Sequence, residues 1–147
     1  MSRRSAREAA VKIIFQNEFV DQRLMPENGT SGETLDAESM LAMYLNSISE
    51  EEGKKLETQY VLNVLDGIIK VVDELDALIL AHSKDWTLDR MAKMDLAILR
   101  VALYEMKYMP DIPVSVSINE AVEIAKQFSY PEASAFINGV LGSVSKA

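Results

Sequence analysis

The stretch MDLAILRVALYEMKYM, residues 94–109, decides the fold class of this chain. Four charged residues interrupt it, namely Asp95, Arg100, Glu105 and Lys107, and a proline follows it directly. A helix that is apolar on all sides normally lies at the centre of a helical bundle, and proline ends helices. We therefore predict a central helix over residues 94–109 with other helices packed around it.

The long segments on both sides of this stretch carry a helical period and not the alternation of a strand. We expect helices over about residues 5–20 and 35–48, then a long helix, then a short turn-helix over 83–90, and two helices after Pro113. The long helix presents one apolar stripe, made of Val61, Leu65, Ile68, Val72, Leu75 and Ile79. The prediction is an all-α domain of about seven helices in two packed halves, about residues 1–82 and 83–147.

Turn-forming residues and caps divide these segments. Residues 25–32 predict a loop, and residues 50–53 predict a solvated break in the pattern. Ser117 and Glu120 have the spacing of a capping box at the start of the sixth helix, with Ser115 as the alternative cap. Pro131 suits the first turn of the seventh helix.

Composition excludes several classes of function. The 147 residues carry a formal charge of −8, one His and no Cys, with a mean hydropathy of zero. Disulfides, thiolate metal sites and cysteine nucleophiles are therefore excluded, and we expect neither a metal nor a cofactor. No apolar run has the length of a membrane span and the start lacks the long apolar stretch of a signal peptide, so we expect a soluble cytoplasmic protein without a membrane partner.

The N-terminus carries a basic cluster, Arg3, Arg4, Arg7 and Lys12, in an otherwise acidic chain. Guanidinium groups bind phosphates, and four such cations on single-stranded RNA give a log–log salt slope of about −2.8. The alternative is a solvated start that frays in water. Phe15 is either a core residue or an exposed aromatic beside the arginines, because two stripes of the first helix could each be its core face.

Three further features suggest buried or close contacts. Arg100 needs a carboxylate partner, for which we expect Glu120 or Glu123 of the next helix. Asp95, one turn earlier, is expected to be exposed, as a helix-start acid or a partner contact. Gly139 and Gly142 lower helix propensity, which suggests that another helix or a ligand approaches closely there.

Several stretches together resemble the NusB family of transcription antitermination factors. The resemblance covers nearly the whole chain, with least support in residues 21–57, and its second half is specific in order and spacing. The matching stretches are RRSAREAA (3–10) with Ile14 and Phe15, ILRVALYE (98–105), DIPV (111–114), INEAVEIAK (118–126) and FINGVL (136–141).

The resemblance implies a NusB-like fold of two helical halves and a role in processive transcription of ribosomal RNA operons. It implies binding of boxA-type single-stranded RNA together with NusE, a small-subunit ribosomal protein, within the transcription elongation complex, and no catalysis. It assigns Asp95 to the side that faces the ribosomal partner. The residues that it assigns to RNA binding are Arg3, Arg4, Arg7, Glu132 and Phe136.

The chain departs from the family pattern at a few positions. Ser5 stands where many members carry another arginine, and Phe15 replaces a frequent tyrosine, so we expect a thinner basic patch. Some members form homodimers that cover the arginine start, and the sequence leaves monomer and homodimer open. Two alternative functions are a helical protein-interaction module without RNA binding, and a stand-alone relative of the RNA-binding domain of ribosomal RNA cytosine methyltransferases.

Overall fold

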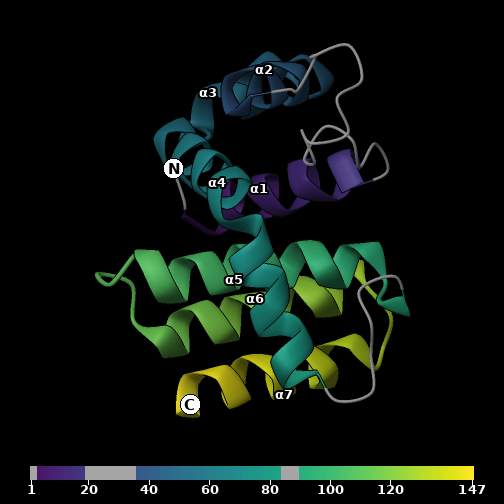
Figure 1. The fold of residues 1–147 in the computed structure, drawn as a ribbon. Helices are drawn as coiled ribbons and strands as arrows, with labels where there is room; N and C mark the ends of the chain where they lie inside the picture. Colours follow the sequence, from purple (N-terminus) through teal and green to yellow (C-terminus); the bar gives the residue numbers. More distant parts are fainter. Residues whose placement is uncertain (1–2, 19–35, 84–89) are drawn as a thin grey trace. The chain divides into compact units, whose positions relative to one another are not determined.

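A computed structural model describes residues 3–18, 36–83 and 90–147. These residues form seven helices and no strand, which confirms the all-α prediction (Figure 1). None of the described helices is both long and apolar enough to cross a membrane. The helices are α1 (Arg3–Glu18), α2 (Ala37–Ser47), α3 (Glu50–Lys55), α4 (Thr58–His82), α5 (Lys93–Tyr108), α6 (Val114–Phe128) and α7 (Ala133–Lys146).

The chain divides into two compact units, and the division falls inside α4. The first unit ends at Ile69 and the second begins at Lys70. Next to this point Val71 leaves the helical conformation, with φ −124° and ψ 21°, so α4 is kinked there. The sequence suggested halves that divide near residue 82, because a helix with one continuous apolar stripe gave no sign of an internal boundary.

In the second unit, α5 is buried over almost its whole circumference, as predicted for the central helix. It packs against α6 and α7, which also pack against each other. The residues of α5 that are buried run without interruption from Asp95 to Leu103 and include Glu105. The other buried apolar side chains of α6 and α7 face this core, and they are Ala121, Ile124, Ala125, Ala133, Ile137, Val140 and Leu141.

In the first unit, α1 buries both of the stripes that the sequence offered as alternatives. Phe15 is half-buried, so it is neither a fully enclosed core residue nor a fully exposed aromatic. The helix can bury both stripes because α2 and the first part of α4 also contribute apolar side chains to this core. The buried residues of α1 are Ala6, Arg7, Ala9, Ala10, Val11, Ile13 and Ile14.

The predicted break at residues 50–53 is wrong, because α3 forms there. Ser49 caps α3 through a capping box: the Ser49 hydroxyl accepts from the backbone N–H of Glu52, and the Glu52 carboxylate accepts from the backbone N–H of Ser49. A capping box satisfies two N–H groups that a short helix otherwise leaves unpaired. The helix is largely exposed, in agreement with the expected solvation. The predicted loop at 25–32 lies outside the described residues, and so does most of the turn-helix at 83–90.

The predicted capping box of α6 is also wrong. The helix begins at Val114 after Pro113, so Ser117 lies within its first turns. The Ser117 hydroxyl donates a 2.7 Å hydrogen bond to the buried carboxylate of Glu105. The Ser117 hydroxyl, which the spacing predicted to cap α6, thus binds the buried Glu105 of α5 instead. In α7, helical structure begins at Ala133, so Pro131 precedes the helix.

Candidate nucleic-acid interface

The basic cluster lies on α1, and its residues differ in exposure. Arg3 and Arg4 are exposed, whereas Arg7 is buried. The first turn of α1 holds no acidic residue, so its cations oppose the positive end of the helix dipole. A helix start of this kind needs stabilisation from elsewhere in the protein, and α4 supplies it.

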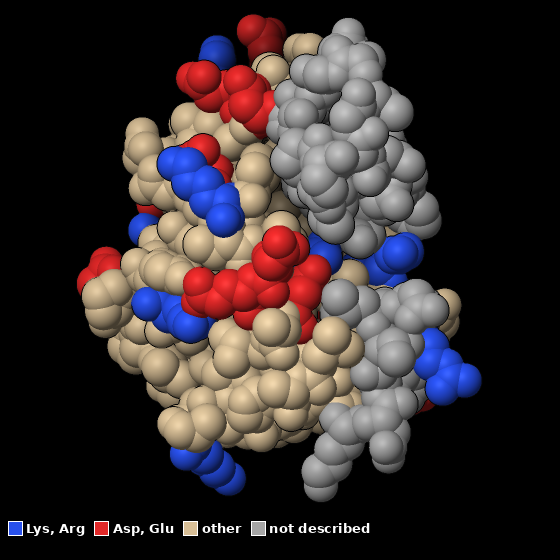
Figure 2. Space-filling model, viewed as in Figure 1, with Lys and Arg blue, Asp and Glu red and all other residues tan. Residues whose placement is uncertain are grey.

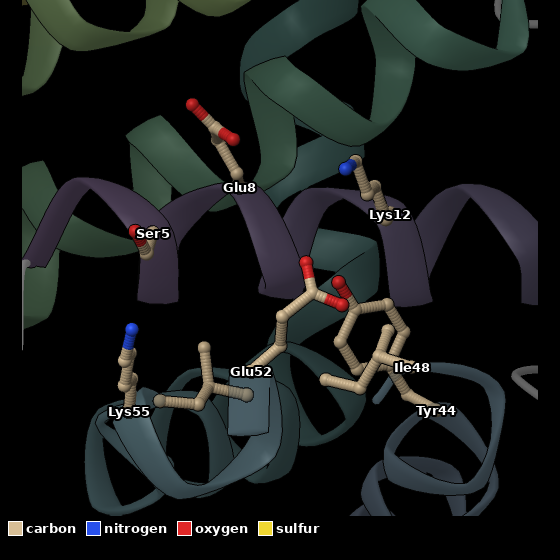
Figure 3. A pocket seen from close by; sticks show the side chains of 8 residues that line it. Ser5, Glu8, Lys12, Tyr44, Ile48, Glu52 and Lys55 are labelled. Carbon is tan, nitrogen blue, oxygen red and sulfur yellow. The ribbon is translucent and has the colours of Figure 1, made fainter. Parts of the chain in front are cut away.

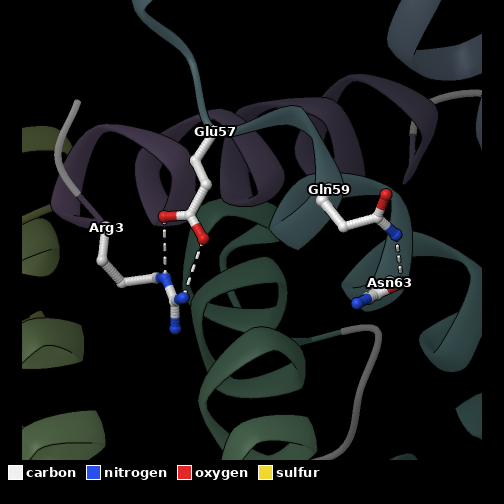
Figure 4. Close-up of polar contacts among 4 residues, drawn as sticks. All are labelled: Arg3, Glu57, Gln59 and Asn63. Atoms are coloured by element: carbon white, nitrogen blue, oxygen red, sulfur yellow. Dashed lines mark hydrogen bonds and ion pairs between the residues drawn. The ribbon is translucent and has the colours of Figure 1, made fainter.

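Arg3 is held by the beginning of α4 through two parallel hydrogen bonds (Figure 4). Its Nε donates to Glu57 Oε1 at 3.1 Å and its Nη2 donates to Glu57 Oε2 at 2.8 Å. Both side chains remain partly exposed, at 40% for Arg3 and 31% for Glu57. Hydrogen bonding from Arg3, together with the charges of Arg3 and Arg7, holds the pKa of Glu57 below its usual value.

Tyr60 provides a second support for the same cluster. The guanidinium carbon of Arg3 lies 4.7 Å from the centroid of the Tyr60 ring, and that of Arg7 lies 5.9 Å from it. Both distances fall within the range of cation–π attraction. Tyr60 is almost fully buried, so the ring is a fixed platform. The sequence did not single out Glu57 or Tyr60, because nothing in their local pattern points back to residues more than fifty positions earlier.

A pocket of about 440 Å³ opens between α1, α2 and α3. Figure 3 shows the Glu52 carboxylate and the Tyr44 hydroxyl close together, both directed toward α1. Burial raises the pKa of Tyr44, and the negative charges of Glu52 and Glu8 raise it further. The lining residues are Ser5, Glu8, Lys12, Tyr44, Ile48, Glu52, Lys55 and Leu56. Lys12 of the basic cluster therefore faces a pocket of mixed charge.

A second pocket, of about 450 Å³, lies in the second unit and brings three predicted residues together. Asp95, Glu132 and Phe136 all line it, from the start of α5 and the start of α7. Glu132 is exposed and Phe136 is half-buried. The remaining lining residues are Arg90, Met91, Ala92, Tyr130 and Ala133.

Tyr130 is a residue of this second pocket that the sequence reasoning missed. Its side chain is 66% exposed, the largest exposure among the exposed large apolar and aromatic residues of the described chain. A large exposed aromatic beside a second aromatic, Phe136, is suited to stacking on a planar ligand. The signal that could have found it is its position directly before Pro131 in the turn between two predicted helices.

Asp95 is buried, and the prediction that it is exposed is wrong. It stands in the first turn of α5, so its expected place as a helix-start acid is correct. Its Oδ1 accepts a 2.5 Å hydrogen bond from the hydroxyl of Ser129, the residue that ends α6. Burial raises the pKa of Asp95, although the bond from Ser129 acts in the opposite direction.

Arg100 forms a buried ion pair, as predicted, but its bidentate partner lies on another helix. Its Nε and Nη2 donate to the two carboxylate oxygens of Asp76 on α4, at 2.9 and 2.8 Å. The sequence pointed to Glu120 or Glu123, because α6 follows α5 directly. Asp76 reaches Arg100 because α4 also packs in this unit, which the order of the elements does not reveal.

The two glycines of α7 do not mark a close approach within the described part of the chain. A Cβ atom built at Gly139 or at Gly142 meets no atom within 4 Å. The expectation of tight packing at these two positions is therefore wrong for contacts inside the described residues.

Charge on the surface follows the acidic composition. On the face shown in Figure 2, acidic side chains form contiguous groups and the Lys and Arg side chains are dispersed. Among the described residues, no three acidic or histidine side chains gather in a way that could hold a metal ion.

Taken together, these features define an all-helical protein with an arginine-bearing first helix and a second pocket that is lined by aromatic and acidic residues. Residues 4–146 match the model of the NusB family. The transcription antitermination protein NusB of Acetivibrio thermocellus is 40% identical over 146 residues, which are 99% of this chain and 90% of that protein. The chain belongs to the NusB family.

Solved structures agree with this assignment. The NusB of T. maritima has 29% sequence identity and a TM-score of 0.78, with 99% of this chain and 92% of that chain covered. A structure of the antitermination factors NusB and NusE in complex with dsRNA has 17% identity and a TM-score of 0.72, with 98% and 96% covered, and so shares the fold. The predicted RNA-binding residues lie in both units, and that they contact RNA stays a prediction.

Proposed function

We propose that this chain is a transcription antitermination factor that binds boxA-type RNA of ribosomal RNA operons together with NusE. The observation that carries the proposal is the exposed, internally braced arginine start of α1 in an acidic chain of the NusB family. Curated relatives over the full length are named transcription antitermination proteins. The chain then acts by binding in the elongation complex, in the cytoplasm, and not by catalysis.

The first unit supplies contacts to the RNA backbone. Arg3 and Arg4 are the exposed cations of the cluster, and guanidinium groups bind phosphates through paired hydrogen bonds. Because Arg7 is buried, we expect two phosphate contacts from this helix start and a contribution of about −1.4 to the salt slope on single-stranded RNA. Arg7 supports the first turn through Tyr60 and the core.

The second unit supplies a place for an unpaired base. Phe136 and Tyr130 border a pocket wide enough for a nucleobase, and aromatic side chains stack on bases of any sequence. Glu132 at the rim can accept hydrogen bonds from the amino groups of a base. The carboxylates that line this pocket also fit a basic protein partner, which is the role that we assign to Asp95.

Two reasons favour NusE as the protein partner: the family to which the chain belongs, and the net negative charge of the chain. With a formal charge of −8, the chain binds RNA weakly alone, because most of its surface repels phosphates. A basic partner removes that repulsion and adds its own contacts. A solved structure of this fold contains NusB, NusE and double-stranded RNA, which supports testing both partners together.

A titration with fluorescent RNA tests the proposal. We expect boxA-type single-stranded RNA to bind more tightly than a scrambled strand, with a marked gain in affinity when NusE is present. A double-stranded form of the same sequence measures the preference for unpaired bases. Equal binding of boxA and scrambled RNA, with no gain from NusE, would show that the cooperative RNA role is wrong.

Arg4→Ala separates this function from a pure protein-interaction role. We expect weaker RNA binding and a salt slope that is smaller in magnitude by about 0.7, because one phosphate contact is lost. The matched control is Lys126→Ala, which removes an exposed cation from α6 of the second unit. Unchanged RNA affinity in Arg4→Ala with intact NusE binding would favour the interaction module without RNA binding.

A further inference from the structure

The contact between Arg3 and Glu57 has the geometry that an arginine uses for phosphate. Two nitrogens of one guanidinium donate to two oxygens of one anionic group, at 3.1 and 2.8 Å. A phosphate group offers the same fork of acceptor oxygens. The pair is partly exposed, at 40% and 31%, so a ligand can reach it from solvent.

Arg3 does not depend on Glu57 alone for its position. The guanidinium carbon of Arg3 lies over the Tyr60 ring at 4.7 Å from its centroid, and this cation–π contact is separate from the hydrogen bonds to Glu57. Those hydrogen bonds are donated by Nε and Nη2 of the guanidinium. The hydrogen-bonding nitrogens can therefore exchange one anion for another while the guanidinium stays on the ring.

We propose that Glu57 is a built-in competitor for the RNA backbone: its carboxylate occupies Arg3 in the free protein, and an RNA phosphate takes its place while Arg3 stays on Tyr60. This inference rests on the proposed RNA-binding function and assigns roles to two residues of the same site. Glu57 restrains the affinity of the site, and Tyr60 is a positioning residue for Arg3 in both states.

The ion pair between Arg3 and Glu57 is weak enough for an RNA phosphate to replace the Glu57 carboxylate. Ion pairs between exposed side chains are weak enough that losing one changes an equilibrium by at most about fivefold. A phosphate of the RNA backbone carries one negative charge, as the Glu57 carboxylate does, and can replace such a partner, whereas a buried pair such as Arg100 and Asp76 would resist replacement. Glu57 therefore lowers the affinity for RNA without blocking the site.

The experiment is a double-mutant cycle that measures RNA affinity for the full-length protein, Glu57→Gln, Arg3→Ala and the double variant, with NusE present. Glu57→Gln keeps the size of the side chain and removes its charge. We expect it to tighten RNA binding by about two- to fivefold. The gain should largely vanish in the Arg3→Ala background, because the guanidinium for which Glu57 and the phosphate compete is then absent.

Two further comparisons separate competition for Arg3 from general charge repulsion between Glu57 and RNA. Glu51→Gln removes a nearby exposed charge from α3 and should change RNA affinity less than Glu57→Gln does. An equal gain from Glu57→Gln with and without Arg3 would overturn the competition, because the effect would be general charge repulsion, and it would leave the proposed function intact. Absence of RNA binding in every variant would overturn the proposed function together with this inference.

Discussion

The Arg3 guanidinium makes two contacts at once, hydrogen bonds to Glu57 and a cation–π contact with Tyr60. The cluster of arginines that looked uniform in the sequence therefore holds three different environments. Arg3 is exposed and held by Glu57 and Tyr60, Arg4 is exposed, and Arg7 is buried. Equal charges with unequal exposure contribute unequally to RNA binding, so single substitutions in this cluster should not be interchangeable.

The pair between Arg3 and Glu57 should also appear in the pH dependence of stability. The pKa of Glu57 lies below its ordinary value of 4.5 in the folded protein, so the pair stabilises the fold above pH 4.5. That stabilisation is lost as the pH falls through the lower, folded value. We expect wild type to exceed Glu57→Gln in free energy of unfolding by at most about 1 kcal/mol at pH 6, and by less at pH 3.5.

Urea denaturation of both proteins across this pH range measures the difference. Glu51→Gln is the matched control, since Glu51 is exposed on α3. The two curves for wild type and Glu57→Gln should approach each other in acid. A constant gap down to pH 3 would contradict the expectation.

Asp95 and Ser129 connect the start of α5 with the end of α6. Because the acceptor is a partly buried carboxylate, we expect the two residues to be coupled by about 1–2 kcal/mol. A cycle of Asp95→Ala, Ser129→Ala and the double variant, measured by chemical denaturation, gives this coupling. Ser145→Ala, at an exposed position of α7, should show no coupling to Asp95. Additive effects at Asp95 and Ser129 would show that the bond does not contribute.

At the scale of elements, α7 carries two glycines, which weaken a helix, at positions where no other part of the described chain packs closely. The positions that a Cβ would occupy at Gly139 and Gly142 are open, so no packing inside the described chain requires glycine there. We therefore expect Gly139→Ala and Gly142→Ala each to raise the free energy of unfolding by about 0.5–1 kcal/mol, since alanine has the higher helix propensity.

Chemical denaturation of these variants is the measurement. Ala135→Gly is the reverse control, because Ala135 is an exposed residue of the same helix. This variant should have a free energy of unfolding that is lower than that of wild type by a similar amount. If the alanine variants are more stable but bind RNA or NusE less well, the two glycine positions of α7 lie on a contact surface. Destabilisation by both alanine variants would contradict the open geometry.

At the scale of the whole molecule, net charge governs how the protein meets its partners. A chain of charge −8 attracts a basic protein over several ångströms, and dissolved salt screens that attraction. We expect the rate constant for association with NusE to fall by about tenfold between about 0.02 M and about 0.5 M salt, with a much smaller change in the dissociation rate.

Stopped-flow mixing at several ionic strengths measures both rates. RNA binding to the isolated chain is the comparison, because it should depend on the few cations of α1 and not on the net charge alone. An association rate with NusE that is independent of salt would show that the acidic surface does not steer this encounter.

The sequence by itself determined the helical class, the central place of α5 and the approximate extent of α2 and α5. These follow from local hydrophobic period and from breakers, which act over a few residues. It also determined the family, because RRSAREAA, ILRVALYE and FINGVL keep their order and spacing along the chain. The site residues could be named by that resemblance, but their surroundings could not be derived.

Only the tertiary structure decided which partners these residues meet. Asp76 pairs with Arg100, Glu57 and Tyr60 hold Arg3, and Ser129 bonds to the buried Asp95. Each contact joins positions more than twenty residues apart. The sequence alone offers several carboxylates as possible partners for Arg3 and for Arg100. The choice among them depends on how helices pack in three dimensions, which local patterns of charge and hydropathy do not specify.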